Sequence, residues 1–328
     1  MKNYFKFNLT GKKLLPLWLL FMLLFLVPYV FIQFKLQSFQ HNPSPEPGQV
    51  FQRMSSLFLI YGVMFVLVII EYIFIFYLAK ITINNMEFKD KSLEFTGQFG
   101  EFIGIFLLGL LLTIITLGIY SPWFITDVYK FFTKNTNYNE SAFEFKGKAS
   151  NLFVIITLTL ILPMIIIMIV TIAMTVKELA QSQTPNMAAT TMPIIMMGVI
   201  FVMMIPYMYF VYKWMINLVY KNYQIQWETS FWPSVGVITG QIILSVITAG
   251  IYLPLASLKL YQYFAEKTFA KSELSTKTFG YEIEPLQDFL FIWGQSLLSI
   301  FTLGIYYPWA FCKITDRITS KTFVIEIN

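Results

Sequence analysis

The sequence predicts an all-α polytopic membrane protein built from repeated helical hairpins, with short β segments on the cytoplasmic side. Three observations carry this prediction: an apolar composition, four apolar runs long enough to cross a bilayer, and one short phrase that occurs three times. Of the 328 residues, 57% are hydrophobic and 12% are charged, whereas soluble domains carry about a quarter charged residues. A soluble core of this size cannot hide so much apolar surface, so lipid must solvate much of it.

The four long apolar runs each reach the roughly 20 residues that a bilayer core demands. They are Leu14–Phe34, Leu57–Ala79, Leu152–Val176 and Met192–Tyr212. The first run follows a basic segment, as in a signal peptide, but it is too long for the apolar region of one and no small-residue cleavage site follows it. We therefore expect it to be an uncleaved transmembrane helix.

Three shorter apolar runs, Phe102–Leu117, Val235–Ala249 and Phe289–Leu303, each lead into the recurring phrase. Three near-copies of one string in a single chain indicate an internal repeat. The copies are Thr116-Leu117-Gly118-Ile119-Tyr120-Ser121-Pro122-Trp123, Thr248-Ala249-Gly250-Ile251-Tyr252-Leu253-Pro254-Leu255 and Thr302-Leu303-Gly304-Ile305-Tyr306-Tyr307-Pro308-Trp309.

The phrase predicts a tight turn between two membrane helices. Its glycine supplies the left-handed conformation that ends a helix, and its proline suits the first turn of the next one. Tyr and Trp favour the membrane–water interface. A gate or a ligand-binding loop is the alternative. The predicted turn residues are Gly118, Pro122, Gly250, Pro254, Gly304 and Pro308.

These markers divide the chain into five hairpin units that start near residues 7, 95, 145, 227 and 279. Together they predict about ten membrane helices, some of them short or re-entrant. Alternating segments such as Phe143–Lys146 and Phe323–Ile327 favour short strands outside the bilayer. Because Thr116 and Thr248 are as far apart as Phe95 and Trp227, we expect residues 1–144 to hold units one and two and residues 145–278 to repeat them. Residues 279–328 then form the fifth unit.

The basic residues predict the sidedness of the chain. Of the 23 Lys and Arg residues, only Lys35, Arg53 and Lys177 lie in the two long inter-helix loops. The others gather at the opposite hairpin ends, so those ends and both termini should be cytoplasmic. The second helix of a short unit, such as Ser121–Asn135 with Asp127 and Lys130, spans only partly or forms a re-entrant hairpin.

Three strings in one part of the chain resemble the YjgN-like family of bacterial inner-membrane proteins. They are Phe95-Thr96-Gly97 with Gly100-Glu101-Phe102-Ile103-Gly104-Ile105-Phe106, Thr116-Leu117-Gly118-Ile119-Tyr120 with Trp123, and Asn135-Thr136 with Phe143-Glu144-Phe145-Lys146-Gly147. The close similarity covers about residues 95–153, and Phe124–Asp127 depart from the basic residues usual there. The resemblance implies a multi-pass protein of the bacterial inner membrane, of unassigned biochemistry.

One acidic residue lies within a predicted span. Glu71 is about 13–14 Å from Lys80 along the helix axis, near the middle of the bilayer. An unpaired carboxylate at that depth is costly, so it must be protonated, paired or in contact with water. Glu71 is therefore a candidate functional residue, as a proton relay or cation site. The alternative is a protonated Glu that bonds a neighbouring helix.

Small and polar residues form a stripe on the helices that lead into the recurring phrase. Offsets of three and four place them on one helix face. Such residues usually let membrane helices pack closely, and a polar pathway is the alternative. The candidate stripe comprises Thr113 and Thr116 (with Gly109 before them), Gln241, Ser245 and Thr248, and Gln295, Ser299 and Thr302.

The remaining acids near the short helices are Glu101, Asp127, Glu228, Asp288 and Asp316. We expect them to be interfacial and paired with Lys130, Lys313 or Arg317, with little effect on stability. The many Met residues are expected to fill apolar space.

Catalysis and cofactor binding find little support. A Cys/His metal site needs several such ligands and a nucleophile needs an adjacent base, and the single Cys and single His, Cys312 and His41, lie far apart in the sequence and favour neither. No phosphate-binding loop, dinucleotide fingerprint or nucleophile elbow occurs. We expect no enzyme activity, no cofactor or metal, and no nucleic-acid partner. The expected partners are membrane lipids and other membrane proteins.

Two function classes remain. The first is a transporter or channel for a small solute or a lipid, which the repeated halves, Glu71 and the polar stripes favour. The second is a non-transporting membrane scaffold that binds lipids or partner proteins. A continuous polar cavity that reaches Glu71 would favour the first.

Overall fold

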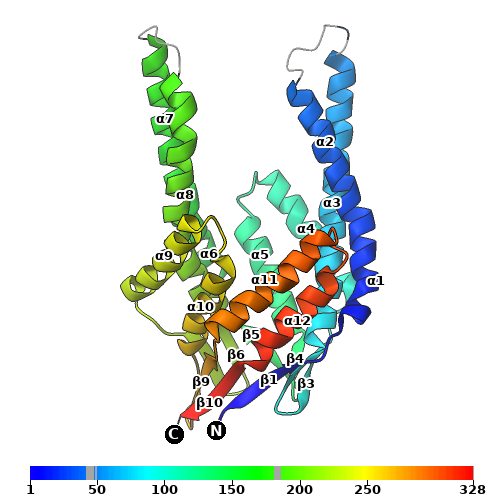
Figure 1. Ribbon diagram of the computed structural model, residues 1–328, viewed down its shortest axis with the longest axis vertical. Helices are drawn as coiled ribbons and strands as arrows, with labels where there is room; N and C mark the ends of the chain where they lie inside the picture. The colour runs from blue at the N-terminus through cyan, green and yellow to red at the C-terminus, as the bar shows by residue number, and fades with distance from the viewer. Residues whose placement is uncertain (42–47, 49, 181–185, 328) are drawn as a thin grey trace.

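The computed structural model describes residues 1–41, 48, 50–180 and 186–327. A β-barrel lies at one end of the molecule, and helical hairpins rise from it (Figure 1). Two hairpins are much longer than the others, and both chain termini lie at the barrel end. Most of the Pro-rich segment after His41 and the segment 181–185 lie outside the described residues.

The order strand, helical hairpin, strand occurs five times along the described chain. The ten strands are β1 (Asn3–Phe7), β2 (Met86–Phe88), β3 (Lys91–Phe95), β4 (Thr136–Tyr138), β5 (Ser141–Phe145), β6 (Asn217–Tyr220), β7 (Tyr223–Trp227), β8 (Thr268–Lys271), β9 (Thr276–Tyr281) and β10 (Thr322–Ile327).

Between the two strands of a unit, the chain forms either a long or a short hairpin. The long hairpins are α1 (Gly11–Phe21), η1 (Met22–Leu26) and α2 (Val27–His41) with α3 (Val50–Ile83), and α6 (Ala149–Ile156), η3 (Thr157–Ile161) and α7 (Leu162–Ala180) with α8 (Asn186–Met215). The short hairpins are α4 (Phe99–Ile115) with α5 (Ser121–Lys134), α9 (Phe231–Ile247) with α10 (Leu253–Glu266), and α11 (Pro285–Phe301) with α12 (Tyr307–Ser320). η1 and η3 are single π-helical turns within otherwise continuous helices.

All ten strands join into one closed antiparallel barrel, in the order β1-β10-β9-β8-β7-β6-β5-β4-β3-β2. The first and last strands pair, with Tyr4 opposite Phe323, so the two ends of the chain close the barrel. Closure leaves no free strand edge. The sequence predicts an all-α protein with only short strands beside the helices. The helical hairpins are present, but the strands join into a barrel, so the fold is mixed and not all-α.

One face of the barrel is aromatic and the other is charged. The ring of Tyr138 lies 5.9 Å from Phe88 and 5.8 Å from Tyr220, although each of these residues is two strands away. The concave side of a barrel brings such side chains together, so the aromatic face lines the interior. The alternate residues, such as Lys6 and Glu144, are exposed on the outside.

The helices form a ring above the barrel. The second helix of each unit contacts the first helix of the next, and α12 closes the ring against α1. At each junction the last residue of an odd-numbered strand is buried against helices. These five residues are Phe7, Phe95, Phe145, Trp227 and Tyr281. The expected boundaries at 144/145 and 278/279 fall inside β5 and β9.

Four helices of the described chain are long and apolar enough to cross a membrane: Gly11–Gln37, Arg53–Ile83, Ala149–Lys177 and Ile195–Met215. They agree with the four long apolar runs in the sequence. The short hairpins are two-sided. Their first helices expose apolar residues, such as Leu108 and Leu111 on α4, whereas α5 and α12 expose Asp127, Lys130 and Lys313. Each short hairpin is therefore amphipathic, with one apolar side and one polar side.

Candidate functional site

A groove of about 520 Å³ lies between the long helix α8 and the short hairpin α9–α10. Its wall is mostly apolar, and Met side chains from α8 form one side of it. Gln241 and Ser245, two residues of the predicted polar stripe, contribute the main polar groups from α9. The lining residues are Met197, Phe201, Met204, Met208, Gln241, Ile242, Ser245, Val246, Ala249, Gly250, Leu253, Ala256, Ser257 and Leu260.

The polar groups in this groove bond mainly to their own hairpin. The Ser245 hydroxyl donates to the Gln241 backbone carbonyl at 2.8 Å, and the Tyr252 hydroxyl donates to Gln241 Oε1 at 3.1 Å. The Lys259 Nζ atom lies 5.7 Å from the centre of the Tyr252 ring. The Gln241 amide nitrogen thus remains the group best placed to donate to a ligand.

The same arrangement occurs in the fifth unit and is missing from the second. Tyr306 donates to Gln295 Oε1 at 2.9 Å and accepts from Lys313 Nζ at 2.9 Å. In the second unit the corresponding position is Gly109, where an added Cβ would meet the Phe124 ring at 2.1 Å. The stripe therefore joins helices by hydrogen bonds in units four and five and by close packing in unit two.

The recurring phrase forms one turn geometry in all three short hairpins. Gly118 has φ +92°, and its N–H donates to the Thr113 carbonyl at 2.7 Å, as in a Schellman motif. Leu117 before it is also left-handed, with φ 50°. The Thr116 hydroxyl accepts the Tyr120 N–H at 3.0 Å. Gly250 and Gly304, with Ser245, Ser299, Thr248 and Thr302, repeat these contacts, and Pro122, Pro254 and Pro308 begin the second helices.

Two of these turns bond to the next unit in the ring. Trp18 Nε1 on α1 donates to the Gly304 carbonyl at 2.8 Å, and Trp293 Nε1 on α11 donates to the Ile251 carbonyl at 2.9 Å. The Gly304 carbonyl also accepts the Tyr307 N–H at 3.1 Å within its own hairpin, so Trp18 adds a second bond there. The turns are therefore held by neighbouring units.

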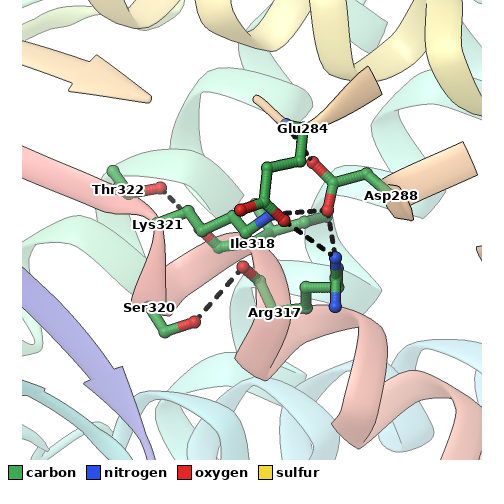
Figure 2. Close-up of polar contacts among 7 residues, drawn as sticks. All are labelled: Glu284, Asp288, Arg317, Ile318, Ser320, Lys321 and Thr322. Carbon is green, nitrogen blue, oxygen red and sulfur yellow. Dashed lines mark hydrogen bonds and ion pairs between the residues drawn. The ribbon is translucent and has the colours of Figure 1, made fainter. Parts of the chain in front are cut away.

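A cluster of charged residues joins α11 and α12 near the barrel (Figure 2). The Asp288 carboxylate, only 1% exposed, accepts hydrogen bonds from Arg317 Nε and Lys321 Nζ, both at 2.6 Å. Its second oxygen accepts the Glu284 N–H at 2.8 Å, and the Glu284 carboxylate contacts Lys321 at 3.0 Å. The expectation of an interfacial Asp288 with little energetic weight is thus wrong in its burial and right in its partner, Arg317.

Asp288 occupies a position that is buried in every unit. Counted from the last residue of the preceding strand, its counterparts are Leu14, Phe102, Leu152 and Ser234, each exposed by no more than 2%. The residue that contacts this position from the second helix of the hairpin also differs between units, and it matches the chemistry of its partner. Phe102 packs on Phe131 with ring centres 5.4 Å apart, Ser234 bonds Tyr263 at 2.9 Å, and Asp288 pairs with Arg317. Aligning the five units in the sequence would have revealed this burial.

The surroundings of Asp288 control its ionisation. Burial disfavours the charged form, but hydrogen bonds from Lys321, from the Glu284 N–H and from Arg317 outweigh burial and hold the pKa of Asp288 below its ordinary value. Burial, together with the Asp288 charge, raises the pKa of nearby Tyr281. The Tyr281 hydroxyl is buried and has no hydrogen-bond partner among the described residues.

Glu71 is separate from both sites. It lies on the exposed side of α3, the second helix of the first long hairpin, and it does not line the groove. The structure therefore brings Gln241 and Ser245 together in one cavity, and it leaves Glu71 apart from them. A functional role for Glu71 stays a prediction.

The chain is similar to known proteins in its sequence. The family described as "Bacterial protein of unknown function (DUF898)" matches residues 90–154 and 150–283. The Inner membrane protein YjgN of Salmonella typhimurium (strain LT2) is 34% identical over 79 residues, which are 24% of this chain. The match covers 20% of that relative's length.

No solved structure matches the chain at a significant level. The two family matches together extend over more than half of the chain, from β3 to β9. They include the strings from which the sequence resembles YjgN-like proteins. The chain therefore belongs to the DUF898 family of bacterial proteins of unknown function.

Proposed function

We propose that this protein is a multi-pass protein of the bacterial inner membrane that binds lipid acyl chains in the groove between α8, α9 and α10 and moves lipids across the bilayer. The observation that carries the proposal is the groove itself. Its volume of about 520 Å³ is in the range of ligand sites, which combine apolar walls with a few polar groups. Similarity to an inner-membrane relative supports the location.

The position of the groove favours a lipid over a small polar solute. Met197, Phe201 and Met204 on its wall belong to the candidate span Ile195–Met215, which supports a groove at the depth of the lipid tails. Flexible Met side chains adapt to varied apolar ligands. The lipid enters sideways from the bilayer, and the Gln241 amide donates a hydrogen bond to its ester region.

The proposed orientation puts the barrel and both termini in the cytoplasm. Only three of the 23 Lys and Arg residues, namely Lys35, Arg53 and Lys177, lie toward the opposite ends of the long hairpins. The positive-inside rule supports this sidedness.

A lipid-binding scaffold that moves nothing is the second candidate. It is favoured by the closed barrel and by the Trp18 and Trp293 bonds that hold neighbouring hairpins together. A frame of this kind organises bound lipids without alternating between two states. The two candidates share the groove and differ in whether the lipid crosses.

The test is lipid movement in proteoliposomes. A fluorescent phospholipid is placed in both leaflets, and an impermeant reductant quenches the outer one; a lipid transporter raises the quenched fraction. Val246→Trp fills the groove and is expected to slow this movement at least several-fold. Ile243→Trp is the matched control, because Ile243 and Val246 are both 50% exposed on α9 and only Val246 lines the groove.

Chain binding is measured on the same vesicles with a phospholipid that carries a spin label on its acyl chain. We expect fewer motionally restricted acyl chains per protein molecule in Val246→Trp than in Ile243→Trp. Restricted chains without movement would support the scaffold. Equal restriction in both variants would show that the groove holds no lipid.

A further inference from the structure

A second, polar pocket lies where the third unit leaves the barrel. It has a volume of about 300 Å³ and is formed by the start of α6, the end of α8 and strands β6 and β7. Its polar side chains are Lys213, Asn151, Asn217 and Gln226, and Trp214 and Trp227 form part of its apolar wall. It is distinct from the acyl-chain groove, with which it shares no lining residue.

Among the described residues that line the pocket, the one charged side chain is the positive Lys213. Lys213 forms no ion pair with a carboxylate of the described residues, and its Nζ atom lies 6.0 Å from the centre of the Tyr209 ring. The acids on β5 and directly after β7 have other partners, since Glu144 pairs with Lys146, and Glu228 with Lys271 at 2.6 Å. An uncompensated ammonium group in a concave site attracts an anion.

The amide side chains around Lys213 can add hydrogen bonds. None of Asn151, Asn217 and Gln226 makes a side-chain hydrogen bond within the described part of the chain, so their N–H donors are available. Several donors around one lysine suit a phosphate group, which offers several acceptor oxygens.

The position of the pocket along the candidate spans favours a lipid headgroup as the source of the phosphate. Lys213 lies near the end of the candidate span Ile195–Met215, and Asn151 lies near the start of the candidate span Ala149–Lys177. Both spans end here on the barrel side, at the level where lipid headgroups meet water. The exposed Lys213 reaches this level from an otherwise apolar helix, as snorkelling lysines do.

We infer that this pocket binds a phosphate group, that of an anionic phospholipid headgroup at the barrel side of the membrane. The inference rests on the proposed function in taking lipids as the ligands, and it adds the headgroup class. The Lys213 ammonium group provides the charge, and the three amides fix the orientation of the phosphate oxygens.

The test compares lipid binding to the full chain in detergent by native mass spectrometry. The probes are phosphatidylglycerol and phosphatidylcholine with identical acyl chains. A hydrogen bond to a charged group is strong enough that its loss weakens binding roughly tenfold or more. We expect Lys213→Gln to lose that much affinity for phosphatidylglycerol and so to lose the preference over phosphatidylcholine. Lys221→Gln, which removes the same charge from the exposed β6–β7 turn, should keep it.

Inorganic phosphate, titrated calorimetrically, separates the two sources of the same chemistry. Phosphate binding that depends on Lys213, without a Lys213-dependent preference for phosphatidylglycerol, would overturn the lipid assignment. Equal losses in Lys213→Gln and Lys221→Gln would overturn the site altogether. Neither variant touches the groove, so spin-labelled chains should stay restricted in both. Loss of chain restriction in Val246→Trp alone therefore reports on the proposed function, independently of the headgroup site.

Discussion

Asp288 shows how one position acquires a different chemistry in each unit of the molecule. A carboxylate that is 1% exposed would be costly alone, but here Arg317, Lys321 and the Glu284 N–H surround it. The counterpart positions achieve the same helix contact with Phe102 on Phe131 or with Ser234 bonded to Tyr263. The buried position is thus filled by an aromatic ring, a hydroxyl or an ion pair in different units. With the ion pair, the stability of the protein depends on the ionisation of Asp288.

Replacing Asp288 with Asn is expected to destabilise the protein at neutral pH by about 2 kcal/mol, the value of hydrogen bonds to a charged group. Because the folded pKa of Asp288 is lowered, its stabilising effect is complete above the unfolded pKa of about 4 and is lost as the pH falls through the folded pKa. The difference between parent and Asp288→Asn in thermal unfolding should therefore be large at neutral pH and shrink in strong acid.

Glu284→Gln provides the comparison for this experiment. Glu284 contacts the same two cations, but its side chain is 53% exposed, so its loss should cost less than about 1 kcal/mol. A pH-independent difference for Asp288→Asn would contradict the role of its charge.

At the scale of the hairpin element, one turn geometry is combined with different inter-helix bonds. The glycine and threonine of the turn are common to the three short hairpins. Gln241 and Gln295 each accept a Tyr hydroxyl across the hairpin, and Gly109 does not. The turn sets the direction of the second helix. In units four and five, the hydrogen bond from Tyr to Gln also joins the first helix of the hairpin to the start of the second.

We expect three Tyr→Phe substitutions to differ in their effect on melting temperature in detergent. Tyr306→Phe removes bonds to both Gln295 and Lys313 and should cost the most, about 1–2 kcal/mol. Tyr252→Phe removes the bond to Gln241 and should cost about 1 kcal/mol. Tyr120→Phe is the matched control in a hairpin without the glutamine, and it should be nearly neutral. If the three variants melted alike, these bonds would have no role in hairpin stability.

At the scale of the whole molecule, the barrel and the helix ring close together. The pairing of β1 with β10 and the packing of α12 on α1 join the two ends of the chain. The strands contain only three to six residues, so each depends on both neighbours for its hydrogen bonds. The barrel can therefore form only when the last unit has been made.

The expected sidedness can be measured by labelling intact cells with an impermeant maleimide. Glu273→Cys, in the exposed β8–β9 turn, should react only after the membrane is permeabilised. Ser44→Cys, at a position outside the described residues, should react from the outside. The parent is the background control, because its single Cys312 is buried. Reaction of Glu273→Cys in intact cells would reverse the orientation.

The sequence by itself determined the features that local patterns encode. Apolar runs of sufficient length define membrane helices wherever they fold, and the Gly and Pro of the recurring phrase end one helix and begin the next. Such signals define the four spans, the three tight hairpins and the starts of the five units, near Phe7, Phe95, Phe145, Trp227 and Phe279.

Only the tertiary structure decided how these parts join. Strands of three to six residues look alike whether they are isolated or paired, because their partners lie in other units. Asp288 is followed by apolar residues and resembles an interfacial acid. Alignment of the units indicates that its position is buried, but its partners Arg317 and Lys321 reach it only when α12 packs against α11. The groove likewise requires the separate walls of α8 and α9. Barrel, ion cluster and groove all depend on contacts between residues far apart in the chain, and local propensity carries no record of them.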